Sequence, residues 1–399
     1  MEYIHAADLI NDIASPLSLP KNSVIICNSM EKIKAVIVGL GRIASLLEED
    51  SLREKPCTHA GALNANPACI LVAGCDTDEE HRRLFAEKWQ VPVYADTAEM
   101  IWLHKPQILV IATYPDSHYH YCRLAAEMGV PVLICEKPLS DNIGEARKIA
   151  ILAKRGAQKV IDQDAHSANR RGPVIITNHE RRYSQDYIKA KAILEQEKLG
   201  ALLSVRANLY MGKNKKLLDV FWHDGTHLAD AIMFLTGAAL KHRRCWGTSL
   251  NARLGTAWLE GELRREKSMP PIPDLIEIGA GRDPSNPQDY SAPAPIPVLI
   301  EIGAGRDHLV FEMEFSCEKG RLRIGNDVFE VWESAPSPYA EKFRSPKRVE
   351  ETFEGPTGYF ANMVEDALAC VNDPQKLPHS SAADGLRVIE YLHSVKAWR

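Results

Sequence analysis

Residues 33–44, IKAVIVGLGRIA, decide the fold, because a short apolar strand runs directly into a G-x-G-x-x-A turn. Gly39 permits the tight turn out of the strand, Gly41 lets backbone N–H groups approach a pyrophosphate, and Ala44 lets a helix pack closely on the sheet. This spacing is typical of a dinucleotide-binding turn. The residues of the turn that we expect to contact the cofactor are Gly39, Gly41, Arg42 and Ile43.

Short apolar runs, rich in β-branched residues, alternate with helical stretches as far as Cys135. The runs predict strands and the stretches between them predict crossover helices, which is the pattern of a parallel sheet. Strands are expected at 35–38, 69–75, 91–94, 108–112 and 132–135, and helices at 79–88, 98–104 and 116–127. The predicted fold class is therefore α/β, with an N-terminal doubly wound parallel sheet of the Rossmann type.

The chain is long enough to form two domains after a short N-terminal extension. The expected divisions are an extension at 1–29, a dinucleotide-binding domain at 30–178 and a substrate and oligomerisation domain at 179–399. Polar stretches without a helical or strand period predict insertions into the first domain near 46–57 and 155–172. We expect the last helix of the chain to pack back on the first domain.

One segment of the second domain occurs twice. PIPDLIEIGAGRD at 271–283 recurs as PIPVLIEIGAGRD at 295–307 with a single difference. Such near-identity indicates a recent tandem duplication, since a functional repeat array needs at least about three units. The prolines of both copies are expected to confine these strands to sheet edges or loops.

Composition and charge exclude several classes of protein. The net charge of −5, without a long run of Lys or Arg, argues against a nucleic-acid or anionic-membrane partner. No apolar run approaches the ~20 residues that span a bilayer. The nine cysteines include no C-x-x-C pair, which argues against zinc and is typical of reduced thiols in the cytoplasm.

Asp76 follows the second predicted strand, where a carboxylate binds the ribose hydroxyls of the adenosine half of a dinucleotide. It lies 32 residues after Ala44 rather than the usual ~20, and the insertion at 46–57 accounts for the extra length. A carboxylate there repels a 2′-phosphate, which favours NAD over NADP, although Arg82 and Arg83 nearby would act in the opposite direction. The alternative is that Asp76 only caps the next helix.

Glu136 and Lys137 stand at the end of another predicted strand. Open α/β sheets bind ligands at the carboxyl ends of their strands, so both side chains should face the cleft. Lys137 can donate a hydrogen bond to a substrate hydroxyl, and its charge lowers the cost of a developing alkoxide. The alternative is a solvated lysine at a strand end.

A third group of polar residues, His223, Asp224 and His227, lies at a predicted helix start. Spacings of three and four residues allow all three side chains to share one helix face. A histidine beside a carboxylate is suited to take the proton of a secondary alcohol while hydride leaves the same carbon. We expect no metal, because no further well-spaced ligands accompany them. Asp224 could equally be a helix N-cap.

These motifs together resemble the glucose-fructose oxidoreductase, inositol dehydrogenase and MocA (Gfo/Idh/MocA) family over about residues 31–396. The resemblance rests on Gly39-Leu-Gly41-Arg-Ile-Ala44, Ala112-Thr113-Tyr114-Pro115-Asp116-Ser117-His118, Glu136-Lys137-Pro138 and Gly225-Thr226-His227-Leu-Ala-Asp230. It implies a C-terminal α+β domain built on an open, mostly antiparallel sheet, with the nicotinamide bound between the two domains.

The resemblance also implies that Lys137 is the cleft lysine and His227 the general acid/base. The chain departs from the family motif D-x-G-x-H, because His223 occupies the position four residues before His227. Either His223 replaces the acid or Asp224 supplies it from the next position. The family further implies that Thr113, Pro115 and His118 lie near the nicotinamide ribose, although His118 could equally lie in a helix turn without ligand contact.

Four more residues are candidates for binding the substrate. Arg181, Arg182 and Tyr183 open the second domain and could bind a phosphate or carboxylate, with at most one arginine pointing inward. His59 could border the substrate site or lie at a solvated helix start.

The sequence therefore predicts a cytoplasmic NAD-dependent oxidoreductase that transfers hydride between nicotinamide and a secondary hydroxyl of a sugar, cyclitol or nucleotide sugar. The resemblance implies a homodimer or homotetramer. One alternative is a transient-redox glycosidase or lyase that retains its NAD, and another is a non-catalytic NAD-sensing regulator. The presence of both Lys137 and His227 counts against a sensor, which needs no group that transfers a proton.

Overall fold

A computed structural model describes residues 31–154, 172–196, 198–212, 215–264, 295–350 and 352–396. The predicted extension, almost all of the predicted insertion near 155–172 and the first copy of the duplicated segment lie outside the described residues. Lys32–Arg399 forms one compact unit, and its strands form two sheets.

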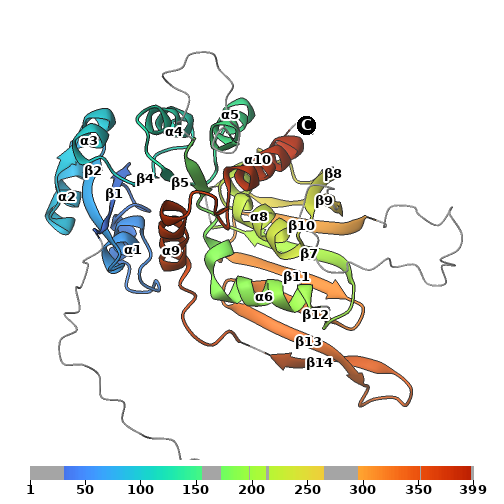
Figure 1. Cartoon of the computed structure of the whole chain (residues 1–399). Coiled ribbons are helices and arrows are strands. Elements are labelled where there is room, and N and C mark those ends of the chain that lie inside the picture. The colour runs from blue at the N-terminus through green and yellow to red at the C-terminus, as the bar shows by residue number, and fades with distance from the viewer. Residues whose placement is uncertain are drawn as a thin grey trace, which may run out of the picture. The chain divides into compact units, whose positions relative to one another are not determined.

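The first sheet is parallel throughout and has the order β3-β2-β1-β4-β5-β6 (Figure 1). Its strands are β1 (Ile33–Val38), β2 (Cys69–Cys75), β3 (Val93–Tyr94), β4 (Ile108–Ile111), β5 (Val132–Cys135) and β6 (Val174–Thr177). The order reverses between β1 and β4, which is where a doubly wound sheet opens a crevice for a ligand. The predicted Rossmann-type sheet is confirmed.

Helices cover both faces of this sheet, which explains why its strands are almost continuously apolar. Along β1, Val36 and Val38 point into one core and Ala35 and Ile37 into the other. The helices of this half are α1 (His59–Ala65), α2 (Glu79–Trp89), α3 (Thr97–His104), α4 (His118–Glu127) and α5 (Ile143–Lys154).

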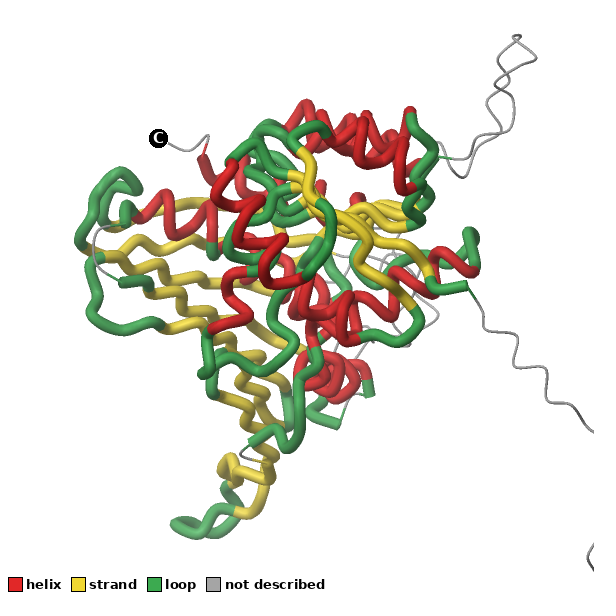
Figure 2. The backbone as a smooth tube through the Cα atoms, turned by 90° about the vertical axis from the view of Figure 1, so that its left-hand side faces the viewer, coloured by secondary structure: helices red, strands yellow, loops and turns green. Residues whose placement is uncertain are grey.

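Two helices from the end of the chain complete this packing (Figure 1), and Figure 2 shows the same backbone turned by 90°. Helix α9 (Tyr359–Asn372) buries Phe360 and Met363 in the same core as Ala35 and Ile37. Helix α10 (Ala382–Lys396) packs against α5, and Ser381, just before it, forms an isolated bridge with Ile176 of β6. Chain beyond 350 therefore lies directly against the dinucleotide-binding half.

The second sheet has the order β14-β13-β12-β11-β7-β10-β9-β8. Its strands are β7 (Leu202–Tyr210), β8 (Ala239–Gly247), β9 (Gly255–Arg264), β10 (Ile296–Ala304), β11 (Val310–Cys317), β12 (Gly320–Gly325), β13 (Val328–Pro336) and β14 (Arg344–Glu350). Only β7 and β10 pair in parallel. The open, mostly antiparallel sheet that the resemblance implies is confirmed.

Helices lie on one face of the second sheet, as Figure 1 shows for α6 and α8. This region contains the 3₁₀ turn η2 (Glu180–Tyr183) and helices α6 (Gln185–Glu195), α7 (Leu217–His223) and α8 (Gly225–Thr236). Buried and partly exposed residues alternate along β11, which is the pattern of a sheet with one covered face. No helix in the described ranges has both the length and the apolar character needed to cross a membrane.

The second copy of the duplicated segment lies inside the sheet, so the expectation of an edge strand or loop is wrong for this copy. It forms β10, between β7 and β9. Pairing with β7 begins at Val298, one residue after Pro297. The missing N–H of Pro297 therefore leaves no gap in that ladder.

The helix expected directly after the glycine turn starts later. A 3₁₀ turn, η1 (Leu46–Glu49), follows the turn, and α1 begins only after Thr58, whose hydroxyl accepts a hydrogen bond from Gly61 N at 3.1 Å. The polar stretch between them is held at its far end, because the Glu54 carboxylate accepts hydrogen bonds from the backbone N–H groups of Thr357 at 2.9 Å and Gly358 at 2.7 Å. It therefore connects the first crossover to the start of α9.

Candidate active site

The glycine turn after β1 has the geometry of an anion site. Gly39 has a φ of +83°, and a Cβ there would lie 2.7 Å from the carbonyl carbon and oxygen of Ala112. A Cβ on Gly41 would meet no atom within 4 Å, so Gly41 borders open space. The N–H groups of Gly41, Arg42 and Ile43 donate to no acceptor in the described part of the chain. Free N–H groups beside open space fit a pyrophosphate.

Asp76 ties the end of β2 to this turn. Its Oδ2 accepts a hydrogen bond from Leu40 N at 2.7 Å and lies 3.2 Å from Nδ1 of His81. The N-cap of α2 is Asp78 rather than Asp76. Nη1 of Arg82 donates to the Asp76 carbonyl at 2.8 Å, which places a guanidinium beside the carboxylate. Asp76 is therefore positioned next to the turn, as an acid that binds the ribose would be.

The loop after β4 is held by His118, which is fully buried. The ring nitrogens lie 3.1 Å from the Thr113 carbonyl oxygen and 3.2 Å from that of Leu139, and burial lowers the pKa of the ring. The Thr113 hydroxyl accepts a hydrogen bond from Ser117, and Pro115 is partly exposed beside it. His118 therefore joins the loops that follow β4 and β5, with both nitrogens directed at main-chain carbonyls.

Glu136 lies in a buried polar cluster at the ends of β5 and β6. Its Oε1 is 2.7 Å from Nε2 of His59 and accepts a hydrogen bond from Asn178 at 2.6 Å. Burial raises the pKa of Glu136, but the hydrogen bonds from His59 and Asn178 and the charge of Lys137 outweigh it and hold that pKa below its ordinary value. His59 is buried in the first turn of α1 rather than solvated. The cluster fixes the backbone from which Lys137 projects.

Lys137 reaches from the first sheet to the second half of the molecule. Its Nζ donates a hydrogen bond to the His223 carbonyl at 3.2 Å. That carbonyl lies at the end of α7, just before α8, which carries His227. Lys137 is therefore held close to the helix start that the sequence picks out.

His227 is a neutral imidazole near neutral pH. Burial, followed by the charges of Lys137, Arg181 and His179, lowers its pKa well below the ordinary value. Its Nδ1 is buried and has no hydrogen-bond partner among the described residues. A neutral imidazole can accept a proton, as a general base must.

His223, Asp224 and His227 do not share one helix, contrary to the expectation from their spacing. His223 ends α7, and α8 begins at Gly225, so the chain changes helix at Asp224. The His223 side chain is exposed, and the Asp224 carboxylate accepts a hydrogen bond from Lys215 at 3.4 Å. Among the described residues, no hydrogen bond or ion pair joins either side chain to Nδ1 of His227.

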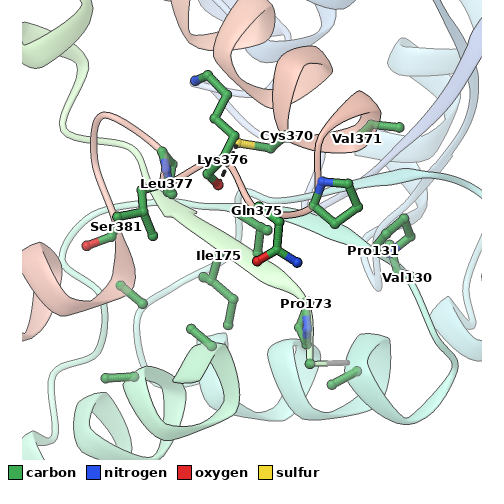
Figure 3. Close-up of a pocket in the computed structure, with 18 of the residues that line it drawn as sticks. Val130, Pro131, Pro173, Ile175, Cys370, Val371, Gln375, Lys376, Leu377 and Ser381 are labelled. Atoms are coloured by element: carbon green, nitrogen blue, oxygen red, sulfur yellow. Dashed lines mark hydrogen bonds between the residues drawn. The ribbon is translucent and has the colours of Figure 1, made fainter. Parts of the chain in front are cut away.

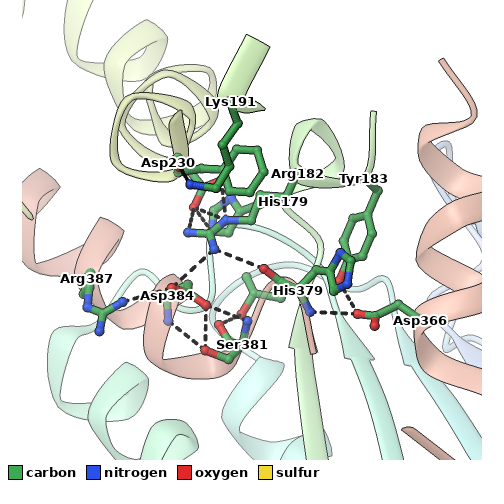
Figure 4. Close-up of polar contacts among 12 residues, drawn as sticks. His179, Arg182, Tyr183, Lys191, Asp230, Asp366, His379, Ser381, Asp384 and Arg387 are labelled. Carbon is green, nitrogen blue, oxygen red and sulfur yellow. Dashed lines mark hydrogen bonds and ion pairs between the residues drawn. The ribbon is translucent and has the colours of Figure 1, made fainter. Parts of the chain in front are cut away.

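Arg182 and Tyr183 lie in the interior (Figure 4). Arg182 donates to both carboxylate oxygens of Asp230, at 2.8 to 3.0 Å, and its Nη1 lies 3.3 Å from Oδ1 of Asp384. Tyr183 donates its hydroxyl proton to Asp366 at 3.1 Å. Both side chains join η2 to elements far along the chain.

Arg181 is only partly buried, and its position differs from that of Arg182. Its guanidinium lies 3.8 Å from the ring centroid of Phe311 and donates to Tyr187 at 2.9 Å and to Asn326 at 2.8 Å. Its charge also acts on His227. Arg182 and Tyr183 are buried, whereas the Arg181 side chain is partly exposed. Of these three residues, Arg181 is therefore the best candidate for binding a substrate.

Three residues after β6, Asn178, His179 and Glu180, belong to the same site but escaped the sequence analysis. Burial raises the pKa of Glu180, against the charges of Arg181 and Lys137. Both ring nitrogens of His179 are buried without a hydrogen-bond partner among the described residues. Glu136 and Lys137 were chosen because open α/β sheets bind ligands at the carboxyl ends of their strands. The same argument applies to the residues after β6, because β5 and β6 are parallel neighbours.

A cavity of about 650 Å³ lies at the amino-terminal ends of β5 and β6, whereas the candidate site lies at their carboxyl ends (Figure 3). Its lining is mainly apolar and includes Val130, Pro131, Pro173, Val371 and Leu377. These residues precede β5 and β6, lie in the last turn of α9 or follow it, so the cavity is separate from the strand ends that carry Lys137 and Glu136. No group of three or more His, Cys, Asp or Glu side chains suited to a metal occurs within the described ranges.

The two glycines of the turn allow a paired test of the cofactor site. The change Gly41→Val should lower NAD affinity at least about tenfold, some 1.4 kcal/mol, because the side chain fills space that the pyrophosphate needs. The melting temperature should stay close to that of the wild type. Calorimetric titration and thermal melting measure the two effects.

The matched variant is Gly39→Ala, whose Cβ would overlap Ala112 and whose positive φ strains the backbone. It should lose about 1–3 kcal/mol or more of folding stability. Wild-type NAD affinity in Gly41→Val would contradict the assigned site.

Acid should destabilise the protein as the pH falls below about 6.5. Burial lowers the pKa of His118, His179 and His227 in the folded chain, so the unfolded chain binds protons first. The free energy of unfolding is therefore highest at pH values above the pKa of histidine in the unfolded chain. Below that pKa it declines by up to about 1.4 kcal/mol per pH unit for each histidine. Glu180, with its raised pKa, acts in the opposite direction.

Urea unfolding at pH 7.5 and 5.5 measures this difference, and the midpoint should be lower at pH 5.5. The variant His120→Gln, at an exposed position of α4, should show the same decline as the wild type. An equal or higher midpoint at pH 5.5 would contradict the assignment of neutral buried histidines.

Comparisons with known proteins agree with this fold. Residues 33–162 match the family model described as "Oxidoreductase family, NAD-binding Rossmann fold". The chain is 28% identical over 194 residues to inositol 2-dehydrogenase of Gluconacetobacter diazotrophicus, a match that covers 44% of this chain and 53% of that protein. Matches to the first two curated relatives span about half of those proteins.

Solved structures resemble the chain over almost its whole length. An oxidoreductase domain protein from Kribbella flavida has a TM-score of 0.66 at 17% identity, with 92% of this chain and 97% of that one covered. UDP-N-acetylglucosamine 3-dehydrogenase from Acidithiobacillus ferrooxidans has a TM-score of 0.62 at 15% identity, with 92% and 99% covered. At these identities the likeness shows the fold alone.

Proposed function

The chain belongs to the Gfo/Idh/MocA family of NAD(P)-binding oxidoreductases, and from this premise we propose that it oxidises a secondary hydroxyl of a sugar, cyclitol or nucleotide sugar with NAD. The observation that carries the proposal is the pairing of an ammonium and a neutral imidazole. Lys137 follows β5, and its Nζ donates a hydrogen bond to the carbonyl of His223, just before α8. Helix α8 carries His227.

Each residue has a definite task in this reaction. NAD, held by the glycine turn after β1 and by Asp76, would supply the hydride acceptor. Lys137 donates a hydrogen bond to the substrate oxygen and stabilises the negative charge that develops there. His227 accepts the hydroxyl proton, which a neutral ring can do and a protonated ring cannot. The cluster of Glu136, His59 and Asn178 holds the strand end from which Lys137 projects.

Substrate binding falls to the partly buried groups around these two. Arg181 presents a charge to His227, and Glu180 lies among the charges of Arg181, Lys137 and Arg53. A carboxyl and a guanidinium together suit the vicinal hydroxyls of a polyol, because one accepts and the other donates hydrogen bonds. Arg182 and Tyr183 instead hold η2 in place.

The preference for NAD over NADP rests on Asp76. Its carboxylate lies at the end of β2, bonded to the glycine turn, where it would meet a 2′-phosphate with like charge. Arg82 donates to the main chain of Asp76 rather than to its carboxylate. We therefore expect tighter binding of NAD than of NADP.

A substrate screen tests the proposed function. The full chain is mixed with NAD or NADP and a panel of sugars, inositols and nucleotide sugars, and the absorbance of the reduced nicotinamide is followed. NADH should accumulate with at least one polyol, and Kd should be lower for NAD than for NADP. Tight NAD binding without turnover on any member of the panel would count against a dehydrogenase.

A further inference from the structure

His179 is a buried histidine for which the reaction described above has no use. It follows β6 directly, and its side chain is 2% exposed. Neither ring nitrogen has a hydrogen-bond partner among the described residues. Its Nε2 is 3.9 Å from Oδ1 of Asp230, which is too far for a hydrogen bond (Figure 4). Buried polar atoms are normally paired, so two open nitrogens on one ring require an explanation.

The charges around His179 come from four elements. Asp230 on α8 and Asp384 on α10 favour a proton on the ring, while Arg182 on η2 and Lys137 after β5 oppose one. Burial has the largest effect and keeps the ring neutral near neutral pH. His179 is thus an uncharged ring beside a carboxylate, able to receive a proton through one nitrogen while the other faces Asp230.

His227 needs such a neighbour. Once it accepts the substrate proton, its imidazolium stands close to Lys137 and Arg181, whose charges act directly on it. The position four residues earlier, where the resembling family has an acid, holds His223, whose side chain is exposed. Nδ1 of His227 has no hydrogen bond to a carboxylate within the described ranges, so the proton lacks a stabilising acid there.

His179 acts electrostatically on His227, because a proton on the His179 ring lowers the pKa of His227. His227 and Asp230 are three residues apart on α8, so they lie on the same side of the helix, and His179 approaches it beside Asp230. The buried nitrogen of His227 that has no partner is Nδ1. The two rings therefore have open nitrogens in the same interior region.

We propose that His179 is the positioning residue of His227, in place of the missing acid: it orients the His227 ring and takes up the proton that His227 removes from the substrate. The inference rests on the proposed function. The substrate O–H bond breaks as Nε2 of His227 gains the proton, and the C–H electron pair leaves as hydride to NAD. Nδ1 of His227 then releases a proton to His179, whose protonated ring is stabilised by the Asp230 carboxylate. Direct contact or one bridging water can carry this transfer.

Two variants of His179 separate proton transfer from packing. The change His179→Leu removes the proton acceptor, whereas His179→Gln keeps a group that accepts a hydrogen bond but cannot carry a proton onward. With a substrate found in the screen, both variants should lower kcat at least about tenfold and leave KM and NAD affinity nearly unchanged. The solvent deuterium isotope effect on kcat should rise, because proton removal becomes limiting. The control is His104→Gln, on α3 and bonded to Tyr94.

A measurement without substrate keeps this inference separate from the proposed function. Histidine Cε1–H signals of the full chain are titrated by NMR in the wild type and both variants. The pKa of His227 should rise in both His179→Leu and His179→Gln, because each variant removes the like charge by which His179 lowers that pKa. An unchanged or lower pKa of His227 in both variants would overturn the inference. This coupling without NADH formation on any substrate would instead count against the proposed function.

Discussion

Replacing His227 with asparagine is expected to lower kcat for hydroxyl oxidation by about 10² to 10⁴, the range that a lost general base produces. Asparagine keeps a polar group of similar size but cannot accept the substrate proton. NAD affinity should not change, since the glycine turn and Asp76 lie at the ends of β1 and β2. Steady-state kinetics and calorimetric titration of NAD measure the two quantities.

Neighbouring variants make this result specific to His227. The changes His223→Ala and Asp224→Asn should each cost less than about fivefold in kcat, below the 10² expected for a general base. The reason is that the His223 side chain is exposed and the Asp224 carboxylate accepts a hydrogen bond from Lys215. A fall of 10² or more in either variant, with His227→Asn close to the wild type, would assign the base elsewhere. In the wild type, kcat should be constant from neutral pH downward until His227 becomes protonated, well below pH 6.5.

The second large effect concerns stability. The change Arg182→Leu should cost about 3–5 kcal/mol of folding free energy, because it leaves the buried carboxylate of Asp230 and that of Asp384 without their shared cation. Arg182 connects η2 to α8 and to α10, so its loss weakens contacts between elements far apart in sequence. Urea unfolding followed by circular dichroism measures the change in free energy.

Arg387 offers a matched control at the edge of the same network. It forms an ion pair with Asp384 at 3.0 Å, but its side chain is 32% exposed. The change Arg387→Leu should cost less than about 1 kcal/mol. Equal losses in the two variants would show that the buried pairing with Asp230 is not the source of the stability.

The first sheet was predictable because its strands are local, apolar and separated by helices with clear starts. Strands β2 and β5 agree with the predicted bounds, as β-branched runs between turn residues are strong signals. The covering of this sheet by α9 was not predictable from a local pattern, because that helix comes from the end of the chain. β10 was misjudged because proline was counted against the whole strand, although Pro297 stands before the pairing with β7 begins.

The candidate site also has features that could be predicted from the sequence and features that could not. Strand ends and the glycine turn could be found from the sequence, and so could Lys137 and His227. The helix break at Asp224, which separates His223 from His227, depends on packing that spacing alone does not reveal. His179 and Glu180 were overlooked, although they follow β6 as Glu136 follows β5. Which of two adjacent arginines lies in the interior was decided by Asp230 and Asp384, far along the chain.

The transfer of deuterium from substrate to cofactor tests the central claim most directly. A polyol found in the screen is labelled with deuterium on the carbon that bears the reactive hydroxyl, and the nicotinamide product is analysed by mass spectrometry and NMR. The account predicts one deuterium at C4 of free NADH for each substrate oxidised, and none with His227→Asn over the same period. Product formed without free, labelled NADH would contradict a dehydrogenase and indicate transient redox chemistry on retained NAD.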